Sequence, residues 1–265
     1  DNHRRICKFF LLAFSNKYQD WNTMIQIQDE IIYAFCTFLT QLNESLMSIN
    51  LHQFMNLFEQ IMEEGQSDYM INRLFYVRTL NAIFKGLGKT ISKYYSYILP
   101  TILSFLNTND DSIFNERQLT IESLELIQTM TQFADDGFFD AEQFNGVLKA
   151  IISHANSVVI TDPQEFFNLV ILHIAPTFAA LMDTTKDDML WRSANLMLID
   201  MMRNDETKIK IAALKICDEE FKVVGSELTT ILAELVPSLS ECAEYSKDAV
   251  DTIARETIQS IENSI

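Results

Sequence analysis

Hydrophobic residues in the last third of the chain recur with the period of an α-helix. They form three sets separated by short polar breaks. The first set is Ile209, Ala212, Ala213, Ile216, Cys217, Phe221 and Val224. The second is Leu228, Ile231, Leu232, Leu235, Val236, Leu239 and Cys242, and the third is Val250, Ile253, Ala254, Ile258 and Ile261. Spacings of three and four residues place each set on one helix face. Because the breaks are short, we expect consecutive helices to be antiparallel neighbours.

The same pattern extends upstream and predicts helices throughout the chain, with no convincing strand. The expected ranges are 3–15, 22–42, 50–64, 68–86, 90–107, 115–134, 140–156, 163–182, 187–203, 206–224, 227–242 and 247–263. Capping residues mark several starts, including Asp140, Asp205, Ser226 and the pair Asp162-Pro163. Such side chains accept hydrogen bonds from the free N–H groups of a first helical turn.

Two segments with a shared pattern favour a solenoid over a helical bundle. Asp205 is followed by Ile209, Lys210 and Ala212, and the stretch 246–254 repeats this arrangement about forty residues later. The pattern resembles the start of the second helix of a HEAT repeat. Prolines near the middle of expected helices are a further HEAT feature, and they occur here at Pro100, Pro176 and Pro237. A proline removes one helical hydrogen bond and kinks the helix.

These observations predict an all-α fold, a HEAT-type α-solenoid of about six antiparallel helix pairs, since one HEAT repeat takes about 40–47 residues. Residues 1–110 would form N-terminal HEAT-like helices. Residues 111–265 would form C-terminal HEAT repeats that continue the first part as one solenoid.

The charge balance changes the expected partners. The chain carries a formal net charge of −17, and it has only 6 Gly and 4 Pro in 265 residues. Few turn residues fit helices joined by short loops. A protein that wraps around nucleic acid needs Lys and Arg to displace the counterions of the phosphates. The negative net charge of this chain opposes such binding. An acidic surface instead favours a basic protein surface as partner.

The four cysteines, Cys7, Cys36, Cys217 and Cys242, lie in apolar helical stretches without a CxxC pair. We interpret them as reduced core thiols of an intracellular protein. Uninterrupted apolar segments such as 31–36 are too short to span a bilayer, so no membrane partner is expected. The chain begins at Asp1 and enters a helical pattern at once. We therefore expect it to be part of a longer protein.

Candidate catalytic and cofactor patterns are weak. Residues 85–90 resemble a phosphate-binding loop, but Ile83 occupies the position of the first glycine and the context is helical. His3, His52, His154 and His173 do not form a recognisable zinc-binding pattern. Acidic pairs and runs occur at 63–64, 110–111, 135–136, 187–188 and 218–220. We interpret these carboxylates as solvated, at helix ends or on polar faces. The sequence thus predicts no enzyme, no cofactor, no metal and no small-molecule substrate.

Basic residues recur at helical spacing in one place. Arg78, Lys85, Lys89 and Lys93 follow one another at intervals of seven, four and four residues, with tyrosines nearby. On a continuous helix they would form a basic stripe for RNA phosphates or an acidic partner. The alternative is an ordinary solvated face, and glycines at 86 and 88 could break the helix. A second basic run, Lys208 to Lys222, is interleaved with acidic residues, so we discount it.

Two stretches resemble one HEAT family in particular. The first contains residues 34–44, the segment 54–61 and residues Arg73 to Tyr76, followed by Lys85, Tyr94 and Ile98. The second contains residues 191–195, 208–214 and 235–241. Both are similar to the C-terminal region of the large HEAT-repeat subunit of the small-subunit processome, in its early transcription-associated subcomplex. Where that family often has Phe, a basic residue and Pro-Leu-Phe, this chain has 51–55 without the basic-proline pair.

The resemblance implies a nucleolar scaffold for ribosome biogenesis that acts in pre-18S rRNA processing. Its partners would be other processome proteins, with local pre-rRNA contact at most. Two alternatives remain at this point. One is a nuclear transport receptor of the importin-β class, which would bind Ran-GTP. The other is a different HEAT scaffold, such as a phosphatase or chromosome-complex subunit.

Overall fold

The computed structural model describes residues 5–6, 30, 34, 37–38, 70–108, 113–244 and 248–265. The predicted helices 3–15, 22–42 and 50–64 fall almost entirely outside these residues, as do Cys7, Cys36, His3 and His52. Every element in the described part of the chain is a helix. The chain forms two compact units, 1–102 and 103–265. The predicted division at residue 110, and the continuity of one solenoid across it, stay predictions.

The described part of the first unit begins with α4 (Met70–Leu87), followed directly by the 3₁₀ helix η1 (Gly88–Tyr94) and by α5 (Tyr95–Thr108). Gly88 ends α4 with φ of +52°, a left-handed conformation that glycine adopts without steric cost. The rings of Phe84 and Tyr95 pack at either end of η1, with centroids 4.7 Å apart. Both side chains are fully buried, so this stacked pair fixes the turn between α4 and α5.

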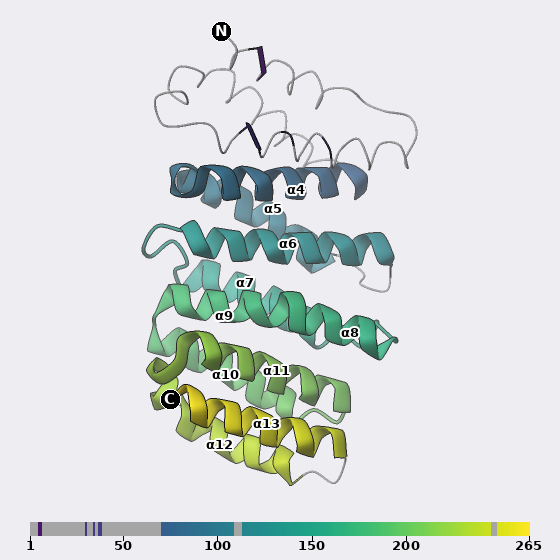
Figure 1. Ribbon diagram of the computed structural model, residues 1–265, viewed down its shortest axis with the longest axis vertical. Helices are drawn as coiled ribbons and strands as arrows, with labels where there is room; N and C mark the ends of the chain where they lie inside the picture. The colour runs from purple at the N-terminus through teal and green to yellow at the C-terminus, as the bar shows by residue number, and fades with distance from the viewer. Residues whose placement is uncertain are drawn as a thin grey trace. The chain divides into compact units, whose positions relative to one another are not determined.

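The second unit stacks helices in two layers (Figure 1). Its elements are α6 (Phe114–Phe133), α7 (Ala141–Ala155), α8 (Pro163–Leu169), η2 (Val170–Ile174), α9 (Ala175–Thr185), α10 (Asp188–Met202), α11 (Thr207–Val224), η3 (Gly225–Leu228), α12 (Thr229–Ala243) and α13 (Asp248–Ser264). In one layer α6 packs on α9, α9 on α11 and α11 on α13. In the other layer α7 packs on α10 and α10 on α12. This alternation of layers along the chain is the arrangement of a helical-repeat solenoid, and it confirms the predicted fold class.

Helices inside the stack are buried on several sides. Helix α11 contacts α9 and α13 within its layer and α10 across the layers. Residues 209–214 of α11 are accordingly buried without interruption, including Lys210, whose Nζ donates to the Met202 carbonyl at 2.9 Å. Trp191 is also buried, and its indole N–H donates to the Met182 carbonyl at 2.8 Å. Trp191 is therefore a core residue.

The prolines are accommodated within helices. Pro100 lies inside α5 and Pro237 inside α12. Pro176 follows η2, a single π-helical turn in the continuous helix 163–185. There the Ala175 N–H donates to the carbonyl of Val170, five residues back. Because Pro176 has no N–H, this wider turn lets the helix pass the proline without a normal α-helical ladder.

The helix 163–185 is also the one in the described part of the chain that is long and apolar enough to cross a membrane. Its 23 residues have a mean hydropathy of 1.5 over the most apolar window. More than half of that window is buried, since α6 and α11 cover the helix on both sides. A core helix that packs between two neighbouring helices can be as long and as apolar as a membrane-spanning helix. Length and hydropathy are therefore weak evidence that helix 163–185 spans a membrane.

Glu220 corrects one interpretation from the sequence. The acidic run 218–220 was expected to be solvated, but Glu220 is fully buried. Its Oε1 accepts a hydrogen bond from Asn195 Nδ2 of α10 at 2.8 Å. Burial raises the pKa of Glu220 to about 8, and the Asn195 hydrogen bond offsets part of this rise. The helical period places residue 220 on the buried stripe with Cys217 and Phe221, and this period overrides the charge of its neighbours.

We expect Leu235→Ala to destabilise the second unit by about 2–5 kcal/mol, because a fully buried leucine is lost and a cavity remains. Val236→Ala is the matched control, since Val236 is half exposed in the same helix. It should cost less than about 1 kcal/mol. Urea unfolding followed by circular dichroism measures both. Equal losses in the two variants would contradict the assigned helix face.

We expect the stability of the second unit to fall as pH rises between 4.5 and about 8, through Glu220. The folded state holds a proton that the unfolded chain releases near pH 4.5, so this contribution to folding is complete at low pH and is lost as pH rises. At neutral pH the loss is roughly 3 kcal/mol.

The Glu220→Gln variant should unfold with a flatter pH dependence and be more stable than the parent at pH 8. Glutamine keeps the shape of the protonated acid and carries no charge. Glu219→Gln, at the adjacent half-buried position, controls for the change in net charge. Thermal melts between pH 5 and pH 8.5 measure the effect. A parent and a Glu220→Gln variant with parallel pH profiles would show that Glu220 does not titrate in this way.

Candidate functional site

The predicted basic residues lie on two consecutive elements. Arg78 and Lys85 lie on α4, where seven residues make nearly two turns and bring them to one face. Lys89 and Lys93 lie on η1, where three residues make a turn, so four residues separate them by about 120°. The break at Gly88 means that the four residues do not form one helical stripe. Lys85, Lys89 and Lys93 are exposed, and Arg78 is half-buried.

The segment 70–108 nevertheless differs in charge from the rest of the chain. It contains five basic residues and no acidic residue. An aromatic surface accompanies them, since the Tyr97 side chain is 72% exposed. The Lys93 ammonium lies 5.2 Å from the centroid of the Tyr94 ring, within cation–π range. Exposed lysines beside tyrosines are suited to phosphates and to stacked bases.

Residues 113–265 have the opposite character, with 26 acidic and 11 basic residues. Most of the cations in this part of the chain already have intramolecular partners. The ion pairs are Arg117–Glu165, Lys186–Glu227, Arg192–Glu234, Arg203–Glu241, Lys215–Glu256, Lys222–Asp218 and Arg255–Asp251. Lys208 and Lys210 donate to backbone carbonyls. Among the described residues, these pairings neutralise the cations and leave a surplus of carboxylates. All four lysines of the second basic run, from Lys208 to Lys222, have partners of these two kinds.

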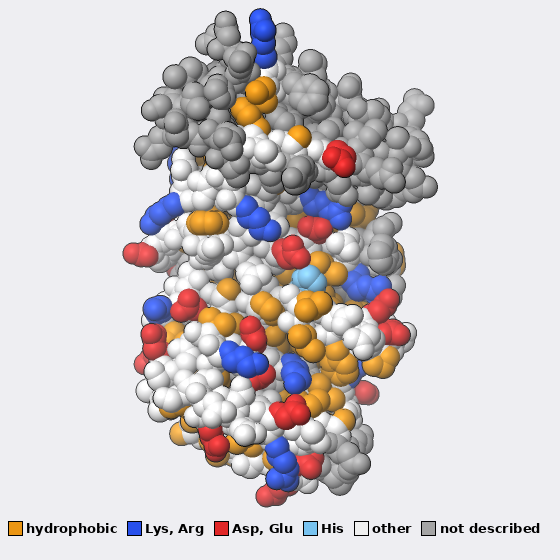
Figure 2. All heavy atoms as spheres, viewed as in Figure 1, with side chains coloured by type: hydrophobic (Ala, Val, Ile, Leu, Met, Phe, Trp, Pro, Cys, Tyr) orange, Lys and Arg blue, Asp and Glu red, His pale blue; other side chains and the backbone are white. Residues whose placement is uncertain are grey.

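Figure 2 shows one face of the molecule, where hydrophobic side chains gather over the helix made by α8, η2 and α9. Ile171 and Leu172 of the π-helical turn are 47% and 61% exposed. Nearby, His173 Nδ1 lies 3.4 Å from Glu125 Oε1 of α6. Charged side chains border this apolar surface on the same face.

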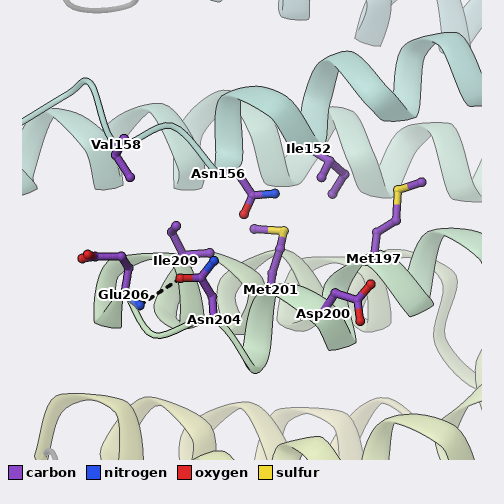
Figure 3. A pocket seen from close by; sticks show the side chains of 9 residues that line it. All are labelled: Ile152, Asn156, Val158, Met197, Asp200, Met201, Asn204, Glu206 and Ile209. Atoms are coloured by element: carbon purple, nitrogen blue, oxygen red, sulfur yellow. Dashed lines mark hydrogen bonds between the residues drawn. The ribbon is translucent and has the colours of Figure 1, made fainter.

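A cavity of about 420 Å³ opens on the second unit where α7 ends and where α10 turns into α11 (Figure 3). Its lining residues are Ile152, Asn156, Val158, Met197, Asp200, Met201, Asn204, Glu206 and Ile209. Ile152 and Asn156 point into it from α7, and Met197, Met201 and Ile209 point toward them from α10 and α11. The Asn204 side chain accepts a hydrogen bond from the Glu206 backbone N–H at 2.9 Å, which holds the connecting turn. The lining thus combines an apolar floor with carboxylates and amides.

The other chemical candidates have structural roles. Residues 85–90 span the end of α4 and the start of η1, so no strand precedes them as a phosphate-binding loop requires. His154 is buried, with Nε2 2.8 Å from the Leu106 carbonyl. Cys217 and Cys242 are buried free thiols, and burial raises the pKa of both. No group of three metal-ligating side chains occurs among the described residues.

Sequence reasoning did not find the cavity, because its lining comes from α7, α10, α11 and two connections, which are separated in the chain. A partial signal was present in the run Asp200 to Glu206, where two methionines are followed by amide and acidic residues at a helix end. Of this run, only Asp205 was interpreted, as a helix start and as the first residue of the HEAT-like pattern. Its packing against the end of α7 could not be deduced from spacing.

Several known proteins are similar to this chain in sequence. A HEAT repeat-containing protein 1 homolog from Dictyostelium discoideum is 24% identical over 143 residues, which is 54% of this chain and 6% of that protein. U3 small nucleolar RNA-associated protein 10 from Schizosaccharomyces pombe is 18% identical and covers 99% of this chain and 16% of its own length. Its counterpart in Aspergillus clavatus is 22% identical over 71% of this chain and 11% of its own length. The chain therefore spans a small fraction of these relatives.

Among solved structures, the crystal structure of an engineered protein aligns with a TM-score of 0.53 and 15% identity, covering 99% of both chains. At this identity the likeness concerns the fold alone. Residues 1–139 match the BP28CT (NUC211) domain, which is more than half of the chain. Together with the relatives, this match confirms the resemblance to the HEAT-repeat subunit of the small-subunit processome. The chain belongs to the BP28CT (NUC211) domain family.

Proposed function

We propose that this chain is a structural scaffold in ribosome biogenesis, which presents a helical-repeat surface for protein assembly in the small-subunit processome. The observation that carries the proposal is its membership of the BP28CT family, whose relatives include proteins named for association with U3 small nucleolar RNA. In this role the chain contributes binding surfaces to pre-18S rRNA processing and no catalysis. It acts in the nucleolus.

The stacked layers suit such a role for a physical reason. Each helix of the second unit contacts its neighbours within and across the layers, so a continuous core holds a long exposed surface in place. Most cations of this unit are paired internally, and the remaining carboxylates give it an acidic surface. The direct partners are therefore processome proteins with basic surfaces, whose encounter with an acidic array is accelerated by long-range attraction.

Residues 70–108 support a second, local contact with pre-rRNA. Lys85, Lys89 and Lys93 are exposed on a segment that lacks acidic residues, and exposed Tyr97 offers a stacking surface. Phosphates would be held by the lysines, and a base would stack on the tyrosine ring. This contact is small compared with the protein surface, because the net charge of −17 opposes extended RNA binding.

We expect this chain to be part of a longer protein. Removal of these 265 residues from that protein should lower its sedimentation with large pre-ribosomal particles and reduce early small-subunit precursor RNA. Gradient sedimentation of the tagged protein and its truncation, with RNA blotting, measures this. A Ran-GTP pull-down with the same extracts tests the importin-β alternative. A protein found only in light fractions and retained by Ran-GTP would overturn the scaffold proposal.

Changing Arg78, Lys85, Lys89 and Lys93 to Glu should abolish binding of the 265-residue chain to single-stranded RNA, and parental binding should weaken steeply with salt. A triple variant that spares half-buried Arg78 separates loss of contact from unfolding. Lys149, Lys186, Arg192 and Arg203 changed to Glu give a control with the same change of charge. Fluorescence anisotropy measures the affinity. Equal loss in the quadruple and control variants would show that only net charge matters.

A further inference from the structure

The cavity between α7 and the α10–α11 turn has two carboxylates on its lining that no cation neutralises. Asp200 and Glu206 are both exposed, and neither has an ion-pair partner among the described residues. Some surface carboxylates of this unit face Arg or Lys, as Glu234 faces Arg192 at 2.9 Å. No basic residue lines the cavity. Its charge is therefore available to a cation from outside.

The space between the carboxylates is apolar. Met197, Met201 and Ile209 point into it, and Met201 and Ile209 are almost fully buried (Figure 3). Figure 3 shows the Glu206 and Asp200 side chains at opposite sides of this floor. Methionine side chains adapt to the shape of a bound group, because they are unbranched and polarizable. A volume of about 420 Å³ lies in the range of small-ligand sites.

This combination matches the side chain of arginine or lysine better than a small inorganic cation. The aliphatic stem of such a residue packs on apolar surface while its charged end reaches a carboxylate. An inorganic cation would gain nothing from the methionines and would need a closer set of oxygen ligands. Phosphate groups of RNA would be repelled by both carboxylates.

We propose that this cavity is a docking site for a short basic segment of a partner protein, with an Arg or Lys side chain between Asp200 and Glu206 and a neighbouring apolar residue on Met197 and Met201. The inference rests on the proposed scaffold function and names one contact through which the scaffold holds a partner. The Asn156 side chain, which points into the same space, offers an amide to the backbone of the bound segment.

The test uses the whole 265-residue chain with ¹³C-methyl-labelled methionine and a labelled heptapeptide of alternating Leu and Arg flanked by glycine. Binding should shift the Met197 and Met201 methyl resonances, assigned through Met197→Leu and Met201→Leu. The same peptide with citrulline in place of arginine keeps the shape and loses the charge. It should bind at least about tenfold more weakly, since a charge-assisted hydrogen bond is lost at each arginine.

The double variant Asp200→Asn with Glu206→Gln should bind the arginine peptide roughly tenfold to a hundredfold more weakly. Asp136→Asn with Glu262→Gln removes the same charge from two exposed positions outside the cavity, and it should leave the affinity within about twofold. Equal weakening in both double variants, or binding without methyl shifts at Met197 and Met201, would overturn the proposal. So would an oligouridylate that shifts the same two methyls, or shifts that follow protein concentration without peptide and thus report a second copy.

The two proposals fail separately. Peptide binding is measured on the purified chain and does not depend on particle assembly. If the peptide fails to bind, but truncation of the longer protein still lowers its association with pre-ribosomal particles, the scaffold function stands and this docking site is wrong. If the peptide binds as expected but truncation has no effect on sedimentation, the site stands and its processome role is wrong.

Discussion

The structure depends on the burial of apolar helix faces against neighbours in the same layer. A helix such as α11 presents apolar residues around most of its circumference, and only contacts with α9, α10 and α13 remove them from water. At roughly 25 cal/mol for each Å² of apolar surface, this burial outweighs any single polar contact in the unit. Because each contact is with an adjacent helix, stability accumulates along the stack, and the outer surface is free to carry charges.

Polar groups inside the stack obey this constraint. Asn195 and Glu220 occupy positions that the helical period makes internal, and they pair with each other at 2.8 Å instead of reaching solvent. Lys210 has a long side chain and satisfies its ammonium group on the Met202 carbonyl, at the end of the preceding helix. The hydrogen bond offsets only part of the cost of burying Asn195 and Glu220, because Asn195 Oδ1 and Glu220 Oε2 have no hydrogen-bond partner. Such contacts nevertheless fix the order of the helices, since a shifted register would leave further buried polar groups without a partner.

The sequence predicts most of the fold because helix periodicity depends on local spacing. The buried position of Leu235 and the breaks at Gly88 and Gly225 follow from residue pattern alone. The π-helical turn before Pro176 does not, because the sequence predicts a kink at a proline and does not indicate that one wider turn replaces it. For Glu220, the acidic neighbours suggested a solvated run while the period placed it inside, and burial of the apolar stripe determined the outcome. The cavity could not be predicted from the sequence, since Ile152 and Met201 come together only when the helices stack.

Charge is divided along the chain in a way that follows from the stacking. Layers fix which side chains remain outside, and in residues 113–265 most outward cations lie close enough to a carboxylate to pair with it. An acidic residue without such a neighbour, such as Asp200 or Glu206, then keeps its full attraction for an external cation. Residues 70–108 have no carboxylate in their own sequence to pair with Lys85 or Lys93. One acidic protein can therefore carry one surface that attracts anions and another that attracts cations. Each surface would select its partner by charge before the two partners come into close contact.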